Sequence, residues 1–298
     1  MNAPETRTVT RFAPSPTGLL HLGTAYSAIY AHEAAKSAGG RFLVRIEDID
    51  QGRCRPEFED AILEDLAWLG LTWEEPVRRQ SGHFADYRAA LDRLAAAGLL
   101  YPCFCTRADI AAEIEASLQE PGRQTAEFHG PDGFIYPGIC RALSADEAAG
   151  RVAAGEAHAL RLKTGAAAAA AGPLTWEDAR AGDRNATPEI FGDVVLARKD
   201  TPASYHLSVT LDDHLQGVTR ATRGKDVLAS THVHRLLQAL LGLQTPLYDH
   251  HAVLTAEDGR KLSKRDKSET IRGLRGDGHS ADAIWNMAMA HAAAEEAA

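Results

Sequence analysis

Residues 8–46 read TVTRFAPSPTGLLHLGTAYSAIYAHEAAKSAGGRFLVRI, and this stretch decides the fold. Two short apolar runs, 8–12 and 41–46, are typical of strands. Between them, residues 24–38 carry small and apolar side chains at helical spacing, and a glycine pair ends the segment. Strand, helix and strand at this spacing predict a βαβ unit and therefore a parallel sheet.

The α/β pattern is interrupted once along the chain. Residues 101–190 are rich in Ala, Gly and Pro and hold three of the four cysteines, which indicates an inserted module. We therefore expect a first half of a nucleotide-binding domain at 1–101, the insertion at 102–190 and a second half at 191–298. Around the insertion, the pattern predicts helices at 56–69, 84–97, 204–215, 227–241 and 280–297, and strands at 194–198, 218–222 and 252–254.

The bulk composition narrows the class of protein. With 298 residues, 45% hydrophobic and 24% charged, the chain can bury a core and does not resemble a disordered or fibrous protein. It has no apolar run long enough for a membrane helix and no signal-peptide core, so we expect no membrane association. Four cysteines without a secretory signal point to a reducing compartment, and we expect a cytoplasmic enzyme. The net charge of −9 leaves room for local basic patches that bind nucleic acid.

A Pro- and Gly-containing loop connects the first strand to the first helix. Pro14, Pro16 and Gly18 stiffen and then bend this loop, which delivers His21 and Gly23 to the helix start. A helix start offers free N–H groups and a positive dipole end to phosphate. Gly23 would let a nucleotide approach the backbone, and His21 can donate to a phosphate oxygen. The alternative for His21 is a purely structural hydrogen bond.

A second basic segment stands near the other end of the chain. Lys261-Leu262-Ser263-Lys264-Arg265 follows an Asp-Gly turn, so two lysines frame a serine on a loop that can fold over a triphosphate. The alternative is a basic hairpin tip. The chain has neither a Walker-type phosphate loop nor GxGxxG, the two commonest phosphate-binding motifs.

These two segments resemble the HIGH and KMSKS elements of class I aminoacyl-tRNA synthetases. The strings RFAPSPTG at 11–18 and RIEDID at 45–50 resemble the glutamyl branch, and Ser15 and Thr17 stand where the glutaminyl branch usually has Glu and Asn. The likeness extends from residue 11 to about 265, with Arg265 in place of the usual serine. It implies a Rossmann-like class I synthetase catalytic domain that joins the α-carboxylate of glutamate to the α-phosphorus of ATP. Mg²⁺ would accompany the ATP.

The resemblance also implies roles for individual residues. Catalysis would fall to His21, Gly23 and Lys264, and the same three would contact ATP together with Lys261 and Ser263. The residues implied for glutamate are Arg11 for the side-chain carboxylate, Glu47 for the ammonium group, and Phe12, Ala13, Pro14, Ser15, Tyr205 and Arg223 around them. The alternatives are ordinary: Arg11 and Arg223 as salt-bridged strand residues, and Tyr205 as a half-buried helix residue.

A cysteine cluster lies in the predicted insertion. Cys103 and Cys105 can chelate one tetrahedral ion, and Cys140 would close most of a structural zinc shell. The pattern resembles the zinc module of glutamyl-queuosine tRNA(Asp) synthetases, which implies Tyr136 as the fourth ligand of one Zn²⁺ per chain. Because the gap at 106–135 is longer than expected, His129 is a competing ligand. Cys54 lies outside this cluster.

Only 33 residues follow Arg265, so we expect no anticodon-binding domain. Truncated relatives of this kind resemble the glutamyl-queuosine enzymes, which implies activation of L-glutamate without tRNA and transfer to queuosine in the tRNA(Asp) anticodon. The basic residues at 260–275 and those of the insertion would then contact the anticodon stem-loop. We expect a monomer. The rival hypotheses are a short discriminating glutamyl-tRNA synthetase that charges tRNA(Glu), and a non-catalytic paralogue that binds glutamate or tRNA.

Overall fold

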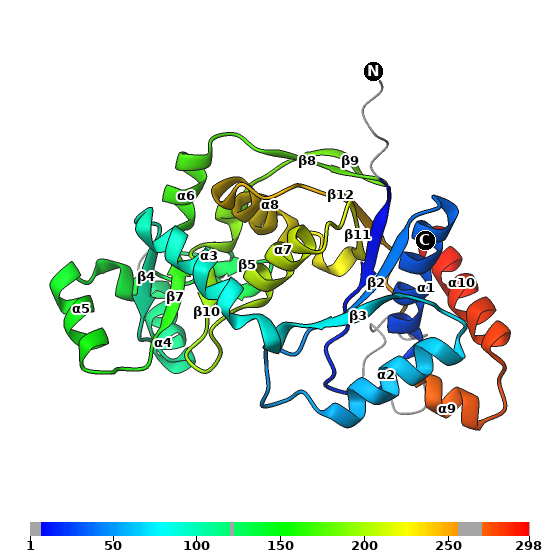
Figure 1. Ribbon diagram of the computed structural model, residues 1–298. Helices are drawn as coiled ribbons and strands as arrows, with labels where there is room; N and C mark the ends of the chain where they lie inside the picture. The colour runs from blue at the N-terminus through cyan, green and yellow to red at the C-terminus, as the bar shows by residue number, and fades with distance from the viewer. Residues whose placement is uncertain (1–6, 120–121, 256–269, 298) are drawn as a thin grey trace, which may run out of the picture.

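The computed structural model describes residues 7–119, 122–255 and 270–297. Its first sheet is the predicted βαβ unit extended by one strand: β1 (Val9–Phe12), β2 (Arg41–Ile46) and β3 (Glu74–Arg79) run parallel in the order β1-β2-β3. Helix α1 (Leu22–Ser37) connects β1 to β2, and α2 (Pro56–Trp68) connects β2 to β3 (Figure 1). His21 is the N-cap of α1 and forms a capping box with Thr24, so the loop ends where the motif predicted.

A second sheet adjoins the first at β1. Strands β11 (Arg220–Gly224), β12 (Leu247–His251) and β8 (Thr175–Asp178) are parallel, and β9 (Gly182–Asn185) is antiparallel to β8. The amide of Thr219, just before β11, donates to the carbonyl of Val9 at 3.0 Å. Strand order therefore runs outward from β1 in both directions, which is the topology at whose carboxyl edge α/β proteins bind ligands. Helices α7 (Tyr205–Leu215) and α8 (Ser230–Leu241) belong to this half.

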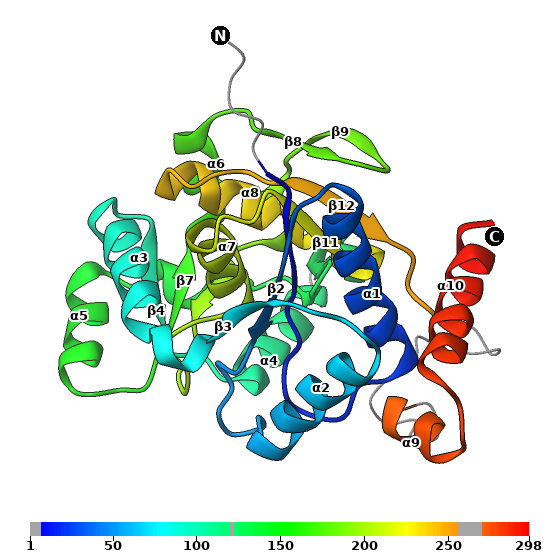
Figure 2. The same cartoon turned by 45° about the vertical axis from the view of Figure 1, so that its right-hand side comes forward.

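A third, antiparallel sheet shares no strand with the first two, and its buried residues pack in one core with α7 and α8. Figure 1 shows its strands with α4 and α5 on one side of the molecule, and α1 and α10 on the other; in Figure 2, α5 and α10 again lie on opposite sides, with α4 near the middle. The strands are β4 (Leu100–Cys103), β7 (Ala159–Leu162) and β10 (Val195–Ala197). The surrounding elements are α3 (Phe84–Ala96), α4 (Arg107–Leu118), α5 (Ala145–Ala153), α6 (Thr164–Ala171) and the hairpin of β5 (His129–Gly130) and β6 (Gly133–Phe134).

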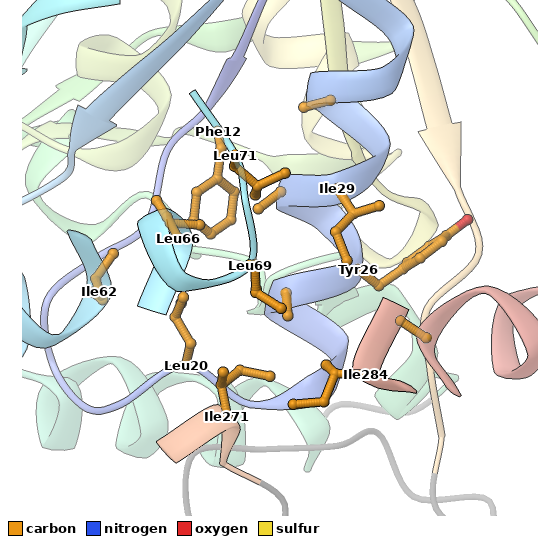
Figure 3. Packing of buried hydrophobic residues seen from close by; sticks show 14 of the residues in the cluster. Phe12, Leu20, Tyr26, Ile29, Ile62, Leu66, Leu69, Leu71, Ile271 and Ile284 are labelled. Carbon is orange, nitrogen blue, oxygen red and sulfur yellow. The ribbon is translucent and has the colours of Figure 1, made fainter. Parts of the chain in front are cut away.

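The main core surrounds α1 (Figure 3). Tyr26 and Ile29 of α1 belong to one buried cluster with Ile62 of α2 and with residues near the carboxyl end of the chain. Those residues come from α9 (Ile271–Gly276) and α10 (Ala281–Ala297) and include Ile271 and Ile284. Small side chains on α1 let α10 lie against it, so the chain's last described helix is part of the nucleotide-binding half. No helix of the described residues is both long and apolar enough to cross a membrane.

Several boundaries differ from the sequence-based predictions. The strand predicted at 252–254 is wrong: the strand is Leu247–His251, whose histidines and aspartate hide it from a search for apolar runs. The strand predicted at 218–222 lies two residues later. Strand β3 was not predicted, because its sequence EEPVRR reads as a polar loop. The alanine tract at 166–171 is the helix α6.

Strand pairing does not follow a division at residue 190. Strand β10 follows that residue in the chain yet pairs with β7 of the third sheet. Strand β8 precedes it yet pairs with β12 of the second sheet. The three-part division at 1–101, 102–190 and 191–298 stays a prediction about domains. In the structure, each of its last two parts contributes a strand to a sheet that contains strands of the other.

Candidate active site

A pocket of about 250 Å³ opens at the carboxyl ends of β1, β2 and β11. Its lining combines two strand-end arginines and one strand-end glutamate with the loop after β1 and the start of α7. All eight residues that the resemblance implied for glutamate line it: Arg11, Phe12, Ala13, Pro14, Ser15, Glu47, Tyr205 and Arg223. Positions up to about 210 residues apart in sequence therefore share one cavity.

Arg11 is held from two sides. Its Nε donates to Asp213 Oδ1 at 2.8 Å and its Nη1 donates to the carbonyl oxygen of Thr222 at 2.7 Å. No described residue accepts a hydrogen bond from Nη2, so this nitrogen keeps two N–H donors for a ligand. The carboxyl of Asp213 is buried, which raises its pKa, but Arg11 and Arg45 more than offset this effect and the pKa is lowered overall. Asp213 is therefore an anion that fixes Arg11.

Glu47 lies opposite this arginine in a chain of alternating charges. Arg45, which is fully buried, donates to Glu47 Oε1 at 3.1 Å and to Asp213 Oδ1 at 2.8 Å. Burial raises the pKa of Glu47, and Arg45 and Arg11 offset only part of the increase. The backbone amide of Glu47 donates to the carbonyl of Pro14 at 2.9 Å, which ties the loop after β1 to the end of β2.

Arg223 is anchored by neutral partners. Its Nε lies 3.1 Å from His250 Nε2, its Nη1 lies 2.9 Å from His234 Nδ1, and its Nη2 donates to Thr231 Oγ1 at 2.5 Å. Tyr205 lines the same pocket as this guanidinium. The pocket therefore contains two buried guanidiniums and one carboxylate, the charge pattern needed for an amino acid with a second carboxylate.

A second pocket of about 340 Å³ lies beside the first and shares Thr24, Ser27 and Gly224 with it. His21 and Gly23 line this second pocket at the amino-terminal end of α1. A methyl group on Gly23 would come within 3.2 Å of the His21 ring, so the glycine leaves room for the imidazole. Helix N–H groups and a histidine here suit a phosphate group.

The predicted lysine loop falls in the part of the chain that is not described. Lys261, Ser263 and Lys264 lie outside the described residues, as do the basic residues 260, 265 and 267. His21 forms an isolated bridge with Thr270, the first described residue after that segment. Arg272 and Arg275 both pair with Glu64 of α2, at 2.8 and 3.0 Å, so these two described cations of the expected basic patch have an acidic partner.

The three predicted cysteines lie together in the third-sheet region. The sulfur atoms of Cys103, Cys105 and Cys140 lie within 4.8 Å of one another. The hydroxyl oxygen of Tyr136 lies 3.4 Å from Cys105 Sγ and accepts from the Cys140 amide at 2.6 Å. His129, the competing fourth ligand, instead places Nδ1 2.9 Å from the carbonyl oxygen of Thr125. Three thiols and a phenol oxygen fit a tetrahedral zinc ion, and the cluster can bind a metal ion.

Sequence reasoning missed the residues that hold the pocket arginines. Asp213, His234 and His250 are buried polar side chains on helices or strands and belong to no recognised motif. The available signal was a pair of adjacent aspartates in the middle of a helix and the histidines around 232–234 and 250–251, since such residues are rarely buried without a partner.

Comparison with known proteins identifies the family. Residues 7–296 match the model for tRNA synthetases class I (E and Q), catalytic domain. The chain belongs to this family. It is 48% identical over 279 residues to a protein of Rhodobacter capsulatus named glutamyl-Q tRNA(Asp) synthetase, covering 91% of this chain and 96% of that one. It is 36% identical to a glutamate–tRNA ligase of Hydrogenobaculum sp., covering 93% of this chain and 56% of the relative.

A solved structure of a class I synthetase has the same fold. The glutamate-tRNA synthetase of Elizabethkingia anophelis matches with a TM-score of 0.72 and 28% identity, over 88% of this chain and 53% of that one. The chain thus spans about half the length of that synthetase. The predicted α/β class I synthetase catalytic fold with a parallel sheet is confirmed, and the protein is a ligase of the class I synthetase family.

Proposed function

We propose that the enzyme activates L-glutamate with ATP and transfers the glutamyl group to queuosine in the anticodon of tRNA(Asp). The observation that carries the first step is the pocket in which Arg11, Arg223 and Glu47 converge. The support for the second step is the likeness to relatives named glutamyl-Q tRNA(Asp) synthetase, which this chain matches over 83–96% of their length in two cases.

The pocket suggests how glutamate binds. The side-chain carboxylate accepts from Arg11 Nη2, which no described residue uses, and from Arg223 or Tyr205. The ammonium group faces Glu47. Glutamine is rejected because its amide would direct N–H donors at guanidinium donors, and buried donors without acceptors are costly. The α-carboxylate then lies toward the wall shared with the second pocket.

ATP occupies that second pocket, with its triphosphate at the start of α1. His21 stabilises the charge that develops as the α-carboxylate attacks the α-phosphorus and pyrophosphate leaves. We extend this role to Lys264, with Gly23 giving the nucleotide access and Lys261 and Ser263 as further contacts. Mg²⁺ bound with ATP would supply neutralisation of the phosphate charge. Positioning, rather than covalent participation of the protein, supplies the rate enhancement.

The structural metal would be Zn²⁺ held by Cys103, Cys105, Cys140 and Tyr136. When bound, it would cross-link β4 to the segment that precedes α5, far from the reacting atoms. Its contribution would be stability of the third-sheet region, where we expect part of the RNA to bind.

Two assays test the proposal. Glutamate-dependent ATP–pyrophosphate exchange should occur without any RNA, and labelled glutamate should be transferred to queuosine-containing tRNA(Asp) but not to the unmodified tRNA(Asp). Transfer to tRNA(Glu), or exchange that requires it, would instead support the second candidate, a short glutamate–tRNA ligase. That candidate is favoured by the 36–40% identity to proteins named glutamate–tRNA ligase. Absence of exchange under all conditions would contradict both.

A further inference from the structure

Each of the two histidines beside Arg223 also forms a hydrogen bond to a further side chain. Arginine only donates, so His234 Nδ1 and His250 Nε2 must both accept from it. Burial and the adjacent arginine keep both imidazoles neutral, with the pKa of His234 well below its usual value and that of His250 lowered to about 4. The proton of each ring is therefore on its other nitrogen. His250 Nδ1 donates to Asp178 at 2.5 Å, and His234 Nε2 donates to His206 Nδ1 at 3.2 Å.

The series of hydrogen bonds through His234 extends away from the pocket. His206 accepts on Nδ1, so its neutral form carries the proton on Nε2, which lies 3.1 Å from Asp132 Oδ2. The His206 ring is buried, whereas the side chain of Asp132 is 60% exposed. The direction of every bond in the series Arg223, His234, His206, Asp132 thus follows from the arginine alone.

Asp132 comes from a part of the chain to which no role has been assigned. It lies in the turn between β5 and β6, within the long gap between Cys105 and Cys140. This hairpin is seated closely on the neighbouring 3₁₀ turn Pro188–Phe191. A Cβ on Gly130 would lie 2.5 Å from the carbonyl oxygen of Ile190, and one on Gly192 would lie 2.6 Å from Ile135 Cγ2. No larger residue could replace either glycine without moving the hairpin.

The same turn also packs against the chain of hydrogen bonds. The ring of Phe191 meets the His206 ring edge to face, with centroids 5.8 Å apart, and the rings of Tyr205 and His234 are 5.5 Å apart. The hairpin, the turn and the start of α7 therefore form one packed unit. Among the residues that the structure describes, Asp132 is the only anion that contacts His206.

We infer that Asp132 is a positioning residue for the glutamate pocket: acting through His206 and His234, it fixes the guanidinium of Arg223. The inference rests on the proposed function, in which Arg223 contacts glutamate. An exposed ion pair alone would contribute little. Here, removal of the acceptor would leave the N–H of a buried imidazole unsatisfied, and the two histidines could then turn and release Arg223.

The test is steady-state ATP–pyrophosphate exchange by the full chain. Asp132→Ala should raise the KM for glutamate about fivefold and leave the KM for ATP within twofold. Asp132→Asn should have a smaller effect, because its amide oxygen still accepts from His206. Glu115→Ala is the matched control, since this exposed carboxylate on α4 makes no hydrogen bond to a described residue and should behave as wild type.

A double-mutant comparison checks the route. If Asp132 acts through His206, then adding Asp132→Ala to His206→Gln should not raise the glutamate KM further. Equal glutamate KM values for Asp132→Ala and wild type, or additive effects in the double variant, would overturn the inference. Calorimetric titration with L-glutamate distinguishes a failure of the proposed function from a failure of the inference about Asp132. Wild-type protein that binds no glutamate contradicts the proposed function and the inference together, whereas binding that Asp132→Ala leaves unchanged overturns only the inference.

Discussion

Glu47, Arg45, Asp213 and Arg11 form a row of alternating charges, and each inner member touches both of its neighbours. Such a row keeps buried ions only while it is complete, because removing one partner leaves an uncompensated charge at a cost of roughly 3–5 kcal/mol. Both ends of the row, Arg11 and Glu47, line the pocket. Arginine stays protonated, so Glu47 is the end whose protonation a ligand and the solvent can influence.

The binding of glutamate should weaken at acidic pH for this reason. Burial raises the pKa of Glu47, and only its ionised form can pair with the substrate ammonium. As the pH falls from neutral through this raised pKa, the KM for glutamate should increase, and above it the KM should be constant. The measurement is the glutamate KM in the exchange assay across pH. Glu47→Gln should show a higher KM that is flat over the same range; parallel profiles for the two proteins would refute the assignment.

Gly23→Ala should separate stability from activity. The added methyl would lie 3.2 Å from Cε1 and Nδ1 of His21, so the imidazole has to move. Alanine in place of glycine near a helix start stabilises by up to about 1 kcal/mol. We expect an unchanged or higher melting temperature with an exchange rate reduced at least tenfold. A variant with wild-type exchange would show that the position of the ring is unimportant.

At the level of elements, the sequence was informative where periodicity is strong. The first βαβ unit, α2 and α3 could be predicted because apolar residues recur at 3.6-residue spacing and glycines mark the ends. Strand β12 could not, because three of its five residues are Asp249, His250 and His251, which are polar yet buried with hydrogen-bond partners. Pattern reasoning sees burial only through hydrophobicity.

In the candidate site too, some residues could be predicted from the sequence and others could not. Its eight pocket residues were found through motifs on one loop and on strand ends, and their roles stay predictions. Their supporting partners were not found, because Asp213, His234 and Asp132 lie 11 to about 200 residues from the arginines that they serve. Only the tertiary structure brings these side chains together.

The cysteine cluster predicts a metal effect confined to one part of the molecule. Cys103→Ser should bind substantially less zinc than wild type by elemental analysis, because a four-ligand site loses one thiolate. Cys54→Ser is the control, since Cys54 lies outside the cluster and beside Ser15. It should retain full zinc content. Unchanged metal content in the first variant would remove the zinc assignment.

For the whole molecule, one buried carboxylate stands out. Asp65 of α2 has a fully buried side chain, and neither of its oxygens has a hydrogen-bond partner within the described part of the chain. Burial raises its pKa from 3.8 to about 6, partly offset by Arg272. Because the folded-state pKa is raised, the protonated form favours folding. The stabilisation is complete below about pH 4 and is lost as the pH rises through 6.

Asp65→Asn should therefore be more stable than wild type at neutral pH. A pKa raised by two units lowers the free energy of unfolding by roughly 2–3 kcal/mol once the carboxyl is ionised. The asparagine amide stays neutral, so the variant does not lose this stability as the pH rises. We expect a higher melting temperature for the variant at pH 7.5 and a difference that disappears near pH 4. Glu64→Gln, which removes only exposed ion pairs with Arg272 and Arg275, should change little. A melting difference independent of pH would contradict this account.

The residues shared by the two pockets have a consequence for inhibitor design. Thr24, Ser27 and Gly224 line both cavities, so the two cavities lie directly side by side. A single compound that links an amino-acid head to an adenosine tail through a non-hydrolysable bridge could fill both at once. Joining the fragments would remove the entropic penalty of capturing two molecules, and such a compound would be a tight-binding inhibitor scaffold for this ligase.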